Sequence, residues 1–189
     1  MKRFAFVLLL FVSTCISAQI QTSPLREQLV SAAEKYVGIR EKTNHNDGPA
    51  VEKILRNVGL RKGDPWCAAL MAQCHDDCNI PNPDSGFCPD WFRSNVVYER
   101  NDPLFADFKA KKGEVYGLYI EYKKRVGHVG MIKDESHFNY EGIEGNANGG
   151  GSDEGDGCYI VFRNKRSIFI ISDYAMSRQE KRDYLNGKL

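Results

Sequence analysis

The sequence predicts a single α+β domain, with helices in its N-terminal half and a mostly antiparallel sheet of five strands in its C-terminal half. Between about residues 24 and 78, apolar residues recur at the three- and four-residue spacing of helices. From residue 115 onward they alternate with polar or small residues, which is the pattern of strands. At 189 residues the chain is long enough for one well-buried core and too short for two full-sized domains.

Three helices are expected in the N-terminal half. A serine followed by a proline opens the first helix, over 24–37, and a glycine ends it. The second helix spans 50–58 and also ends at a glycine. Asp64 and Pro65 repeat the pattern of an N-cap followed by a first-turn proline, so the third helix is expected to begin there and to continue to about residue 78.

The C-terminal half is expected to hold the five strands and a last helix over 173–185. The expected strands span 115–121, 128–132, 138–144, 159–163 and 168–171. The first two of them form a hairpin. Between 79 and 112 only one short helix, at about 89–94, is expected, and the glycine-rich stretch 146–157 is expected to be a loop.

Composition and charge exclude several classes of protein. With 42% hydrophobic residues, the chain is too apolar for a disordered protein, and its charged fraction of 27% is too high for a polytopic membrane protein. The 26 lysines and arginines balance 25 aspartates and glutamates, which gives a formal net charge of +1. Binding of nucleic acid through a basic surface is therefore not expected.

The first eighteen residues have the layout of a secretory signal peptide. Lys2 and Arg3 precede an apolar run over 4–12, and small and polar residues lead to an expected cleavage site after Ala18. The apolar run is too short to span a bilayer, which needs about 20 residues. We therefore expect an exported protein, periplasmic or extracellular, without a membrane span. A lipoprotein anchored through Cys15 is the less favoured alternative.

The expected mature domain, 19–189, has an odd number of cysteines. The five are Cys67, Cys74, Cys78, Cys88 and Cys158. In an oxidising compartment cysteines tend to pair, so one of the five is left over as a candidate reactive thiol. Disulfides between Cys78 and Cys88 and between Cys74 and Cys158 are one hypothesis for the other four, although connectivity does not follow from sequence.

Cys67 is the candidate nucleophile. In the expected third helix it occupies the third position, beside the free N–H groups and the positive end of the helix dipole. Such a position lowers the pKa of a thiol and makes the thiolate available. The same N–H groups can hold the oxyanion that forms when a thiolate attacks a carbonyl carbon. The alternative for any single cysteine is a small buried apolar side chain.

A nucleophilic cysteine needs a base, and the chain offers four histidines. His45 lies in a polar loop, His75 lies two helical turns from Cys67, and His137 lies at a strand edge or turn. His128 begins an expected strand between two nearby glycines, where the strand can pass close to the helix start. A base on a strand facing a nucleophile on a helix makes a rigid pair, so His128 is the candidate base.

A third group must orient the imidazole of His128. Glu144 and Asn146 end the next expected strand, and pairing between neighbouring strands would place either of them beside His128. A role in the following turn is the structural alternative for both residues.

Three short runs resemble the cysteine, histidine-dependent amidohydrolases/peptidases, the CHAP family, which cleave bacterial peptidoglycan. The runs are Asp-Pro-Trp-Cys-Ala-Ala at 64–69, Gly-His-Val-Gly at 127–130 and Ile-Glu-Gly-Asn at 143–146. The resemblance extends over roughly 38–166. It implies a papain-like α+β fold in which Cys67 is the nucleophile, His128 the base, and Glu144 or Asn146 the orienting group.

The resulting expectation is an exported bacterial cysteine hydrolase that cleaves an amide bond of peptidoglycan through a thioester. The bond lies either between the lactyl group and the stem peptide or within the peptide. No metal or organic cofactor is needed. The expected partner is peptidoglycan, and an inhibitor or a targeting protein remains open. The alternative function is a disulfide-stabilised envelope-binding protein that has the fold without catalysis.

The sequence contains two candidate metal sites and favours neither. The group Cys74, His75, Cys78 and Cys88 could ligate zinc, but its cysteine spacing is wider than that of the common zinc knuckle. Three loop acids lack the ligand spacing of a known calcium loop. They are Asp153, Glu154 and Asp156.

Two tryptophans are candidates for stacking on substrate. Trp66 precedes the candidate nucleophile, and Trp91 follows in the irregular segment. Trp66 is the candidate substrate-binding residue, with core packing as the structural alternative for both.

Overall fold

The computed structural model describes residues 23–103, 108–150 and 155–187. The expected signal peptide over 1–18, including Cys15, lies outside these residues, as do Asp153 and Glu154 of the disfavoured calcium loop. Among the described residues, no helix combines the length and the apolar character that crossing a membrane requires.

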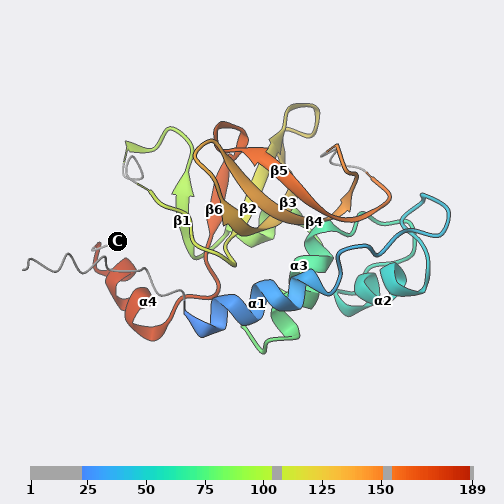
Figure 1. Cartoon of the computed structure of the whole chain (residues 1–189), viewed down its shortest axis with the longest axis horizontal. Helices are drawn as coiled ribbons and strands as arrows, with labels where there is room; N and C mark the ends of the chain where they lie inside the picture. The colour runs from blue at the N-terminus through green and yellow to red at the C-terminus, as the bar shows by residue number, and fades with distance from the viewer. Residues whose placement is uncertain (1–22, 104–107, 151–154, 188–189) are drawn as a thin grey trace, which may run out of the picture.

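The fold is α+β, as predicted, and it has two layers. Figure 1 shows the N-terminal helices along one face of a twisted sheet. They are α1 (Pro24–Glu34), α2 (Pro49–Asn57) and α3 (Cys67–Asp76). A fourth helix, α4 (Arg178–Leu185), lies at the end of the molecule near the sheet edge. Short 3-10 turns connect other segments, namely η1 (Cys88–Phe92), η3 (Glu121–Lys123) and η4 (Lys165–Ser167).

The sheet has six strands in the order β1-β6-β2-β3-β4-β5, and every neighbouring pair is antiparallel. The strands are β1 (Val96–Glu99), β2 (Val115–Ile120), β3 (Arg125–Glu135), β4 (Asn139–Ala147), β5 (Gly157–Asn164) and β6 (Ile170–Ser172). The predicted hairpin of β2 and β3 is confirmed. The predicted number of five strands is wrong, because β1 is an edge strand of four partly exposed residues without a clear alternation.

Two helix starts differ from the sequence prediction. The third helix begins at Cys67 and not after Asp64, because the Asp64 carboxylate accepts a hydrogen bond from the backbone N–H of Arg61 (2.8 Å) and closes a separate turn. Cys67 is therefore the first residue of α3 and not the third. The last helix begins at Arg178, where Ser177 and Glu180 form a capping box.

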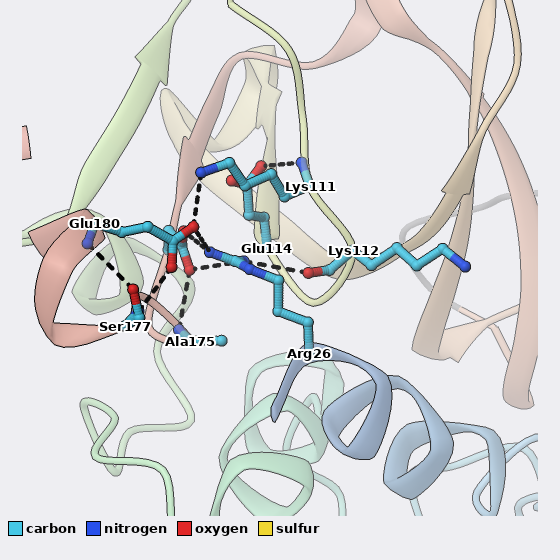
Figure 2. Close-up of polar contacts among 8 residues, drawn as sticks. Arg26, Lys111, Lys112, Glu114, Ala175, Ser177 and Glu180 are labelled. Atoms are coloured by element: carbon cyan, nitrogen blue, oxygen red, sulfur yellow. Dashed lines mark hydrogen bonds and ion pairs between the residues drawn. The ribbon is translucent and has the colours of Figure 1, made fainter. Parts of the chain in front are cut away.

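A buried ion pair fixes the segment before α4 to the core. Arg26 of α1 donates two hydrogen bonds to Asp173, at 3.1 Å and 2.6 Å, and both side chains are 2% exposed. Figure 2 shows Arg26 reaching from α1 toward Glu180 and the backbone oxygen of Lys112. This cluster attaches the C-terminal segment to the helical layer, and it lies apart from the candidate site.

The core between the layers positions α3 on the sheet. α3 packs on β3 and β4. Alternate strand residues form the apolar floor beneath it, and they are Val115, Val129, Met131 and Ile143. Strand residues that point to the other face of the sheet form a second apolar cluster, with Tyr116, Ile132 and Tyr140 among its members. The start of α3 is thereby held over the strands that carry the predicted base and its partner.

Candidate active site

The structure brings three of the predicted site residues together. Cys67 lies at the first position of α3, His128 lies on β3, and Glu144 lies on β4. All three side chains are buried, and Cys67 is 2% exposed. They reach one place because α3 packs against both strands.

His128 connects the other two residues. Its Nε2 lies 2.8 Å from Oε2 of Glu144, so the Nε2–H group donates a hydrogen bond to the carboxylate, which fixes the orientation of the ring. The remaining nitrogen, Nδ1, is buried and has no hydrogen-bond partner within the described residues. In the neutral ring, Nδ1 is then the nitrogen that can accept a proton, which is what a base for the Cys67 thiol requires.

Glu144 is itself held by two residues that the sequence did not single out. Arg163 of β5 donates from Nε to Oε1 and from Nη2 to Oε2, both at 2.6 Å. The Tyr116 hydroxyl of β2 donates to Oε1. Burial alone would raise the pKa of Glu144, but Arg163 and His128 lower it to about 2. The carboxylate is therefore charged at every pH at which the protein is expected to work.

A glycine makes this arrangement possible. A Cβ at Gly130 would lie 2.5 Å from the Tyr116 hydroxyl oxygen and 2.7 Å from Cγ of Glu144. The second glycine of the Gly-His-Val-Gly run is thus explained by the close approach of two side chains.

The sequence does not identify Arg163 as a site residue. An arginine within a short strand is typical of a solvent-exposed position, and only the order of the strands in the sheet brings it beside Glu144.

Cys67 and His128 each shift the pKa of the other toward its charged form. The Cys88 thiol, whose Sγ lies 3.5 Å from Sγ of Cys67, and the His128 imidazole lower the pKa of Cys67 well below its ordinary value, although burial opposes them. Burial also opposes the charged form of His128, but Cys67 and Glu144 raise its pKa to about 10. Each charged group therefore favours the other, so the contact favours the thiolate of Cys67 together with the imidazolium of His128.

Asn146, the other candidate for the orienting group, lies two residues further along β4. It is buried, with a backbone φ of 54°. It lines a polar hollow of about 550 Å³ together with Glu41, Asn46 and Asp156. Glu144 is thus the residue that the structure places on the His128 ring.

Trp66 does not offer a face to substrate, so that expectation is wrong. Its side chain is fully buried, and Nε1 donates to Oε1 of Glu41 at 2.8 Å. A Cβ at Gly145 would lie 2.7 Å from the Trp66 ring, which explains the glycine in the Ile-Glu-Gly-Asn run. Trp66 is therefore a core residue next to the start of α3.

Neither hypothetical disulfide is present. The five described cysteines are free thiols, and Cys88 lies beside Cys67 and not beside Cys78. The pKa of Cys74 is raised by burial and by the neighbouring Cys158, so those two thiols lie near each other without a bond.

The zinc alternative is not supported by the residues that the structure describes. They contain no group of three or more histidines, cysteines or acids arranged to hold a metal. His75 is buried on α3, its Nδ1 lies 2.7 Å from the Met71 carbonyl oxygen, and burial lowers its pKa to about 4. It packs against Trp91 and Tyr174 as a core residue.

We expect the reaction of Cys67 with iodoacetamide to slow much less between pH 8.5 and pH 6 than the reaction of a free cysteine, because the pKa of Cys67 is lowered. A free cysteine, with a pKa of about 8.5, slows roughly 100-fold between these two values because its thiolate fraction falls. Peptide mass spectrometry over time measures the rate at each cysteine. Cys74 and Cys158 are internal controls, because the pKa of each is raised by burial. A Cys67 rate that falls with pH as steeply as that of free cysteine contradicts the lowered pKa.

Comparison with known proteins found no family model that matches the chain and no curated protein similar to it.

Proposed function

We propose that this protein is an exported bacterial cysteine hydrolase of the CHAP type, with a papain-like fold, that cleaves an amide bond in peptidoglycan. The observation that carries the proposal is the connected series of Cys67, His128 and Glu144. A thiolate at a helix start faces an imidazolium that a buried carboxylate orients. This is an arrangement that serves nucleophilic acyl transfer by a cysteine.

The residues supply each step of a thioester cycle. The Cys67 thiolate attacks the carbonyl carbon of the amide, and the free N–H groups at the start of α3 stabilise the oxyanion. His128 gives its proton to the leaving amine, and the C–N bond breaks to leave a thioester on Cys67. His128 then takes a proton from water, whose oxygen attacks the thioester. The C–S bond breaks, the carboxylic acid leaves, and the proton stays on His128, which restores the thiolate of Cys67 and the imidazolium of His128.

Two hollows on either side of Pro65 favour a substrate that carries charged and polar groups. The first is the polar hollow that contains Asn146 and Asp156. The second, of about 220 Å³, is lined by Cys88, Phe87 and Arg125 among others. Stem peptides of peptidoglycan carry both carboxylates and amide or ammonium groups. A peptide that lies across Pro65, the residue common to both hollows and two positions before Cys67, would place charged groups in both.

Digestion of purified peptidoglycan tests the proposal. The protein is expected to release soluble muropeptides, and Cys67→Ala is expected to release none. The masses of the fragments show whether the lactyl amide or a peptide bond is cut. Cys78→Ala is the matched control, since Cys78 lies on the same segment, is partly exposed and takes no part in the site. If neither the parent nor the variant releases fragments while both sediment with the wall, the protein is a wall-binding protein and the proposal is wrong.

Arg125 is expected to recognise a stem carboxylate. Its guanidinium lies 4.8 Å from the Phe87 ring centroid, and Nη1 donates to the Val126 carbonyl oxygen, so its described partners are uncharged. Arg125→Gln should lower kcat/KM about 10- to 100-fold on muropeptides with free carboxylates, the loss of one charge-assisted hydrogen bond, and much less on amidated ones. Steady-state kinetics on the two substrates measure this.

The matched control is Arg166→Gln, which removes an exposed arginine from η4. It should leave both rates unchanged. An equal loss on both substrates after Arg125→Gln contradicts recognition of the carboxylate.

A further inference from the structure

Cys88 is a second thiol directly beside the nucleophile. Its Sγ lies 3.5 Å from Sγ of Cys67, although the two residues are 21 positions apart. Both side chains are buried, at 2% and 5% exposure. No other described cysteine is placed in this way against Cys67, and the catalytic cycle proposed above uses Cys67 alone.

Cys88 is held in place by the core. It begins the turn η1, whose Trp91 is fully buried and donates from Nε1 to the Ser85 carbonyl oxygen at 3.1 Å. The Tyr174 hydroxyl donates to the Trp91 carbonyl oxygen at 2.9 Å. The closeness of the two sulfur atoms is therefore built into the packing of η1 against α3.

Cys88 connects the pair to a hollow. It is among the residues that line the hollow of about 220 Å³ that contains Arg125 and Phe87, and Sγ of Cys67 lies 3.5 Å from Sγ of Cys88. Bonding the two cysteines requires an approach of about 1.5 Å from their present separation, which side-chain rotation can supply.

We propose that Cys67 and Cys88 form a reversible disulfide that switches off the nucleophile. The oxidant is a disulfide, R–S–S–R, either a small molecule or an exported thiol oxidoreductase. The Cys67 thiolate attacks one sulfur of the oxidant, which breaks the S–S bond and forms a mixed disulfide. The released R–S⁻ takes the proton of the His128 imidazolium and leaves as the first R–SH. Cys88 loses its proton and attacks Sγ of Cys67, and the second R–SH leaves. Two protein thiols have lost two electrons and two protons, and the oxidant has become two thiols.

The two cysteines have different electrostatic surroundings, which fits these two roles. The imidazolium of His128 favours the thiolate of Cys67, so Cys67 attacks first. The pKa of Cys88 is raised by its contact with Cys67 and by burial, so its thiol stays protonated until the first bond has formed. In the reduced protein the protonated Cys88 thiol donates a hydrogen bond to the Cys67 thiolate.

Peptide mapping after treatment with glutathione disulfide tests the proposal without any wall substrate. The purified protein is oxidised, alkylated with iodoacetamide, digested and analysed by mass spectrometry. We expect a Cys67–Cys88 cross-linked peptide, a fall of at least about tenfold in Cys67 alkylation, and full recovery with dithiothreitol. Cys78→Ser is the matched control and should form the same cross-link.

Two variants keep the test decisive. In Cys88→Ser, glutathione should stay on Cys67 as a mixed disulfide, because no second thiol displaces it. In Cys67→Ser, Cys88 should resist oxidation. A lasting mixed disulfide on Cys67 with Cys88 intact, or a cross-link that pairs Cys88 with Cys78, overturns the proposal. Because no outcome depends on wall cleavage, the switch and the proposed function can fail separately.

Discussion

Glu144→Ala is expected to lower the free energy of unfolding by about 3–5 kcal/mol, among the largest effects for one substitution in this protein. The change leaves Arg163 and His128 without the carboxylate to which both now donate. It also leaves the buried Tyr116 hydroxyl without its acceptor. Unfolding in urea, followed by circular dichroism, measures the loss.

Glu135→Ala is the matched control. Glu135 also forms an ion pair on the sheet, with Lys165 at 2.7 Å, but its side chain is 42% exposed. An exposed pair of this kind contributes about 0–1 kcal/mol. If Glu144→Ala costs no more than Glu135→Ala, the buried carboxylate does not hold the site together.

Acid should remove the contribution of the Glu144 carboxylate to the free energy of unfolding without a mutation. The pKa of Glu144 falls from its ordinary 4.5 to about 2 on folding, so its stabilising effect is complete above pH 4.5 and is lost as the pH falls toward 2. The part of the acid-induced loss due to Glu144 should be absent in Glu144→Gln, which cannot take up a proton. Urea unfolding between pH 2 and 5 compares the two proteins, and equal slopes would contradict the assignment.

Much of the candidate site could be predicted because its residues lie in short runs with local meaning. Cys67 follows a turn-forming Asp-Pro pair, and His128 lies between two glycines, so each was identifiable from its neighbours. The prediction that the strand after His128 carries its partner depended only on the pairing of consecutive strands, which is frequent. Glu144 and Asn146 could not be separated, because the choice depends on the bulge between Glu144 and Ala147.

The rest depended on contacts between distant parts of the chain. Arg163 acts on Glu144 only because β5 lies beside β4, and Cys88 reaches Cys67 from a segment without periodicity. Asp64 looked like a helix cap, but a competing hydrogen bond to the backbone N–H of Arg61 displaced the helix start by two residues. Edge strand β1 was missed for a related reason, since its pairing with β6 joins two segments more than 70 residues apart.

His128→Ala is expected to lower the rate of wall hydrolysis about 10²- to 10⁴-fold, the range for loss of a general acid and base. Glu144 keeps its two hydrogen bonds from Arg163, so the variant should remain folded by circular dichroism. The release of muropeptides over time measures the rate. His137→Ala is the matched control, because His137 is exposed and packs edge-to-face on Phe138.

The pH profile separates a catalytic from a merely structural role for His128. Hydrolysis needs the thiolate of Cys67 and the protonated ring of His128, whose pKa is raised to about 10, so kcat/KM should stay level through neutral pH and fall near pH 10. His128→Ala should lose that alkaline fall. Its Cys67 should still be alkylated faster at pH 6 than a free cysteine, because the Cys88 thiol still donates to it. A variant that loses hydrolysis while keeping this reactivity shows that His128 transfers the proton to the leaving amine, a step that Cys88 cannot perform.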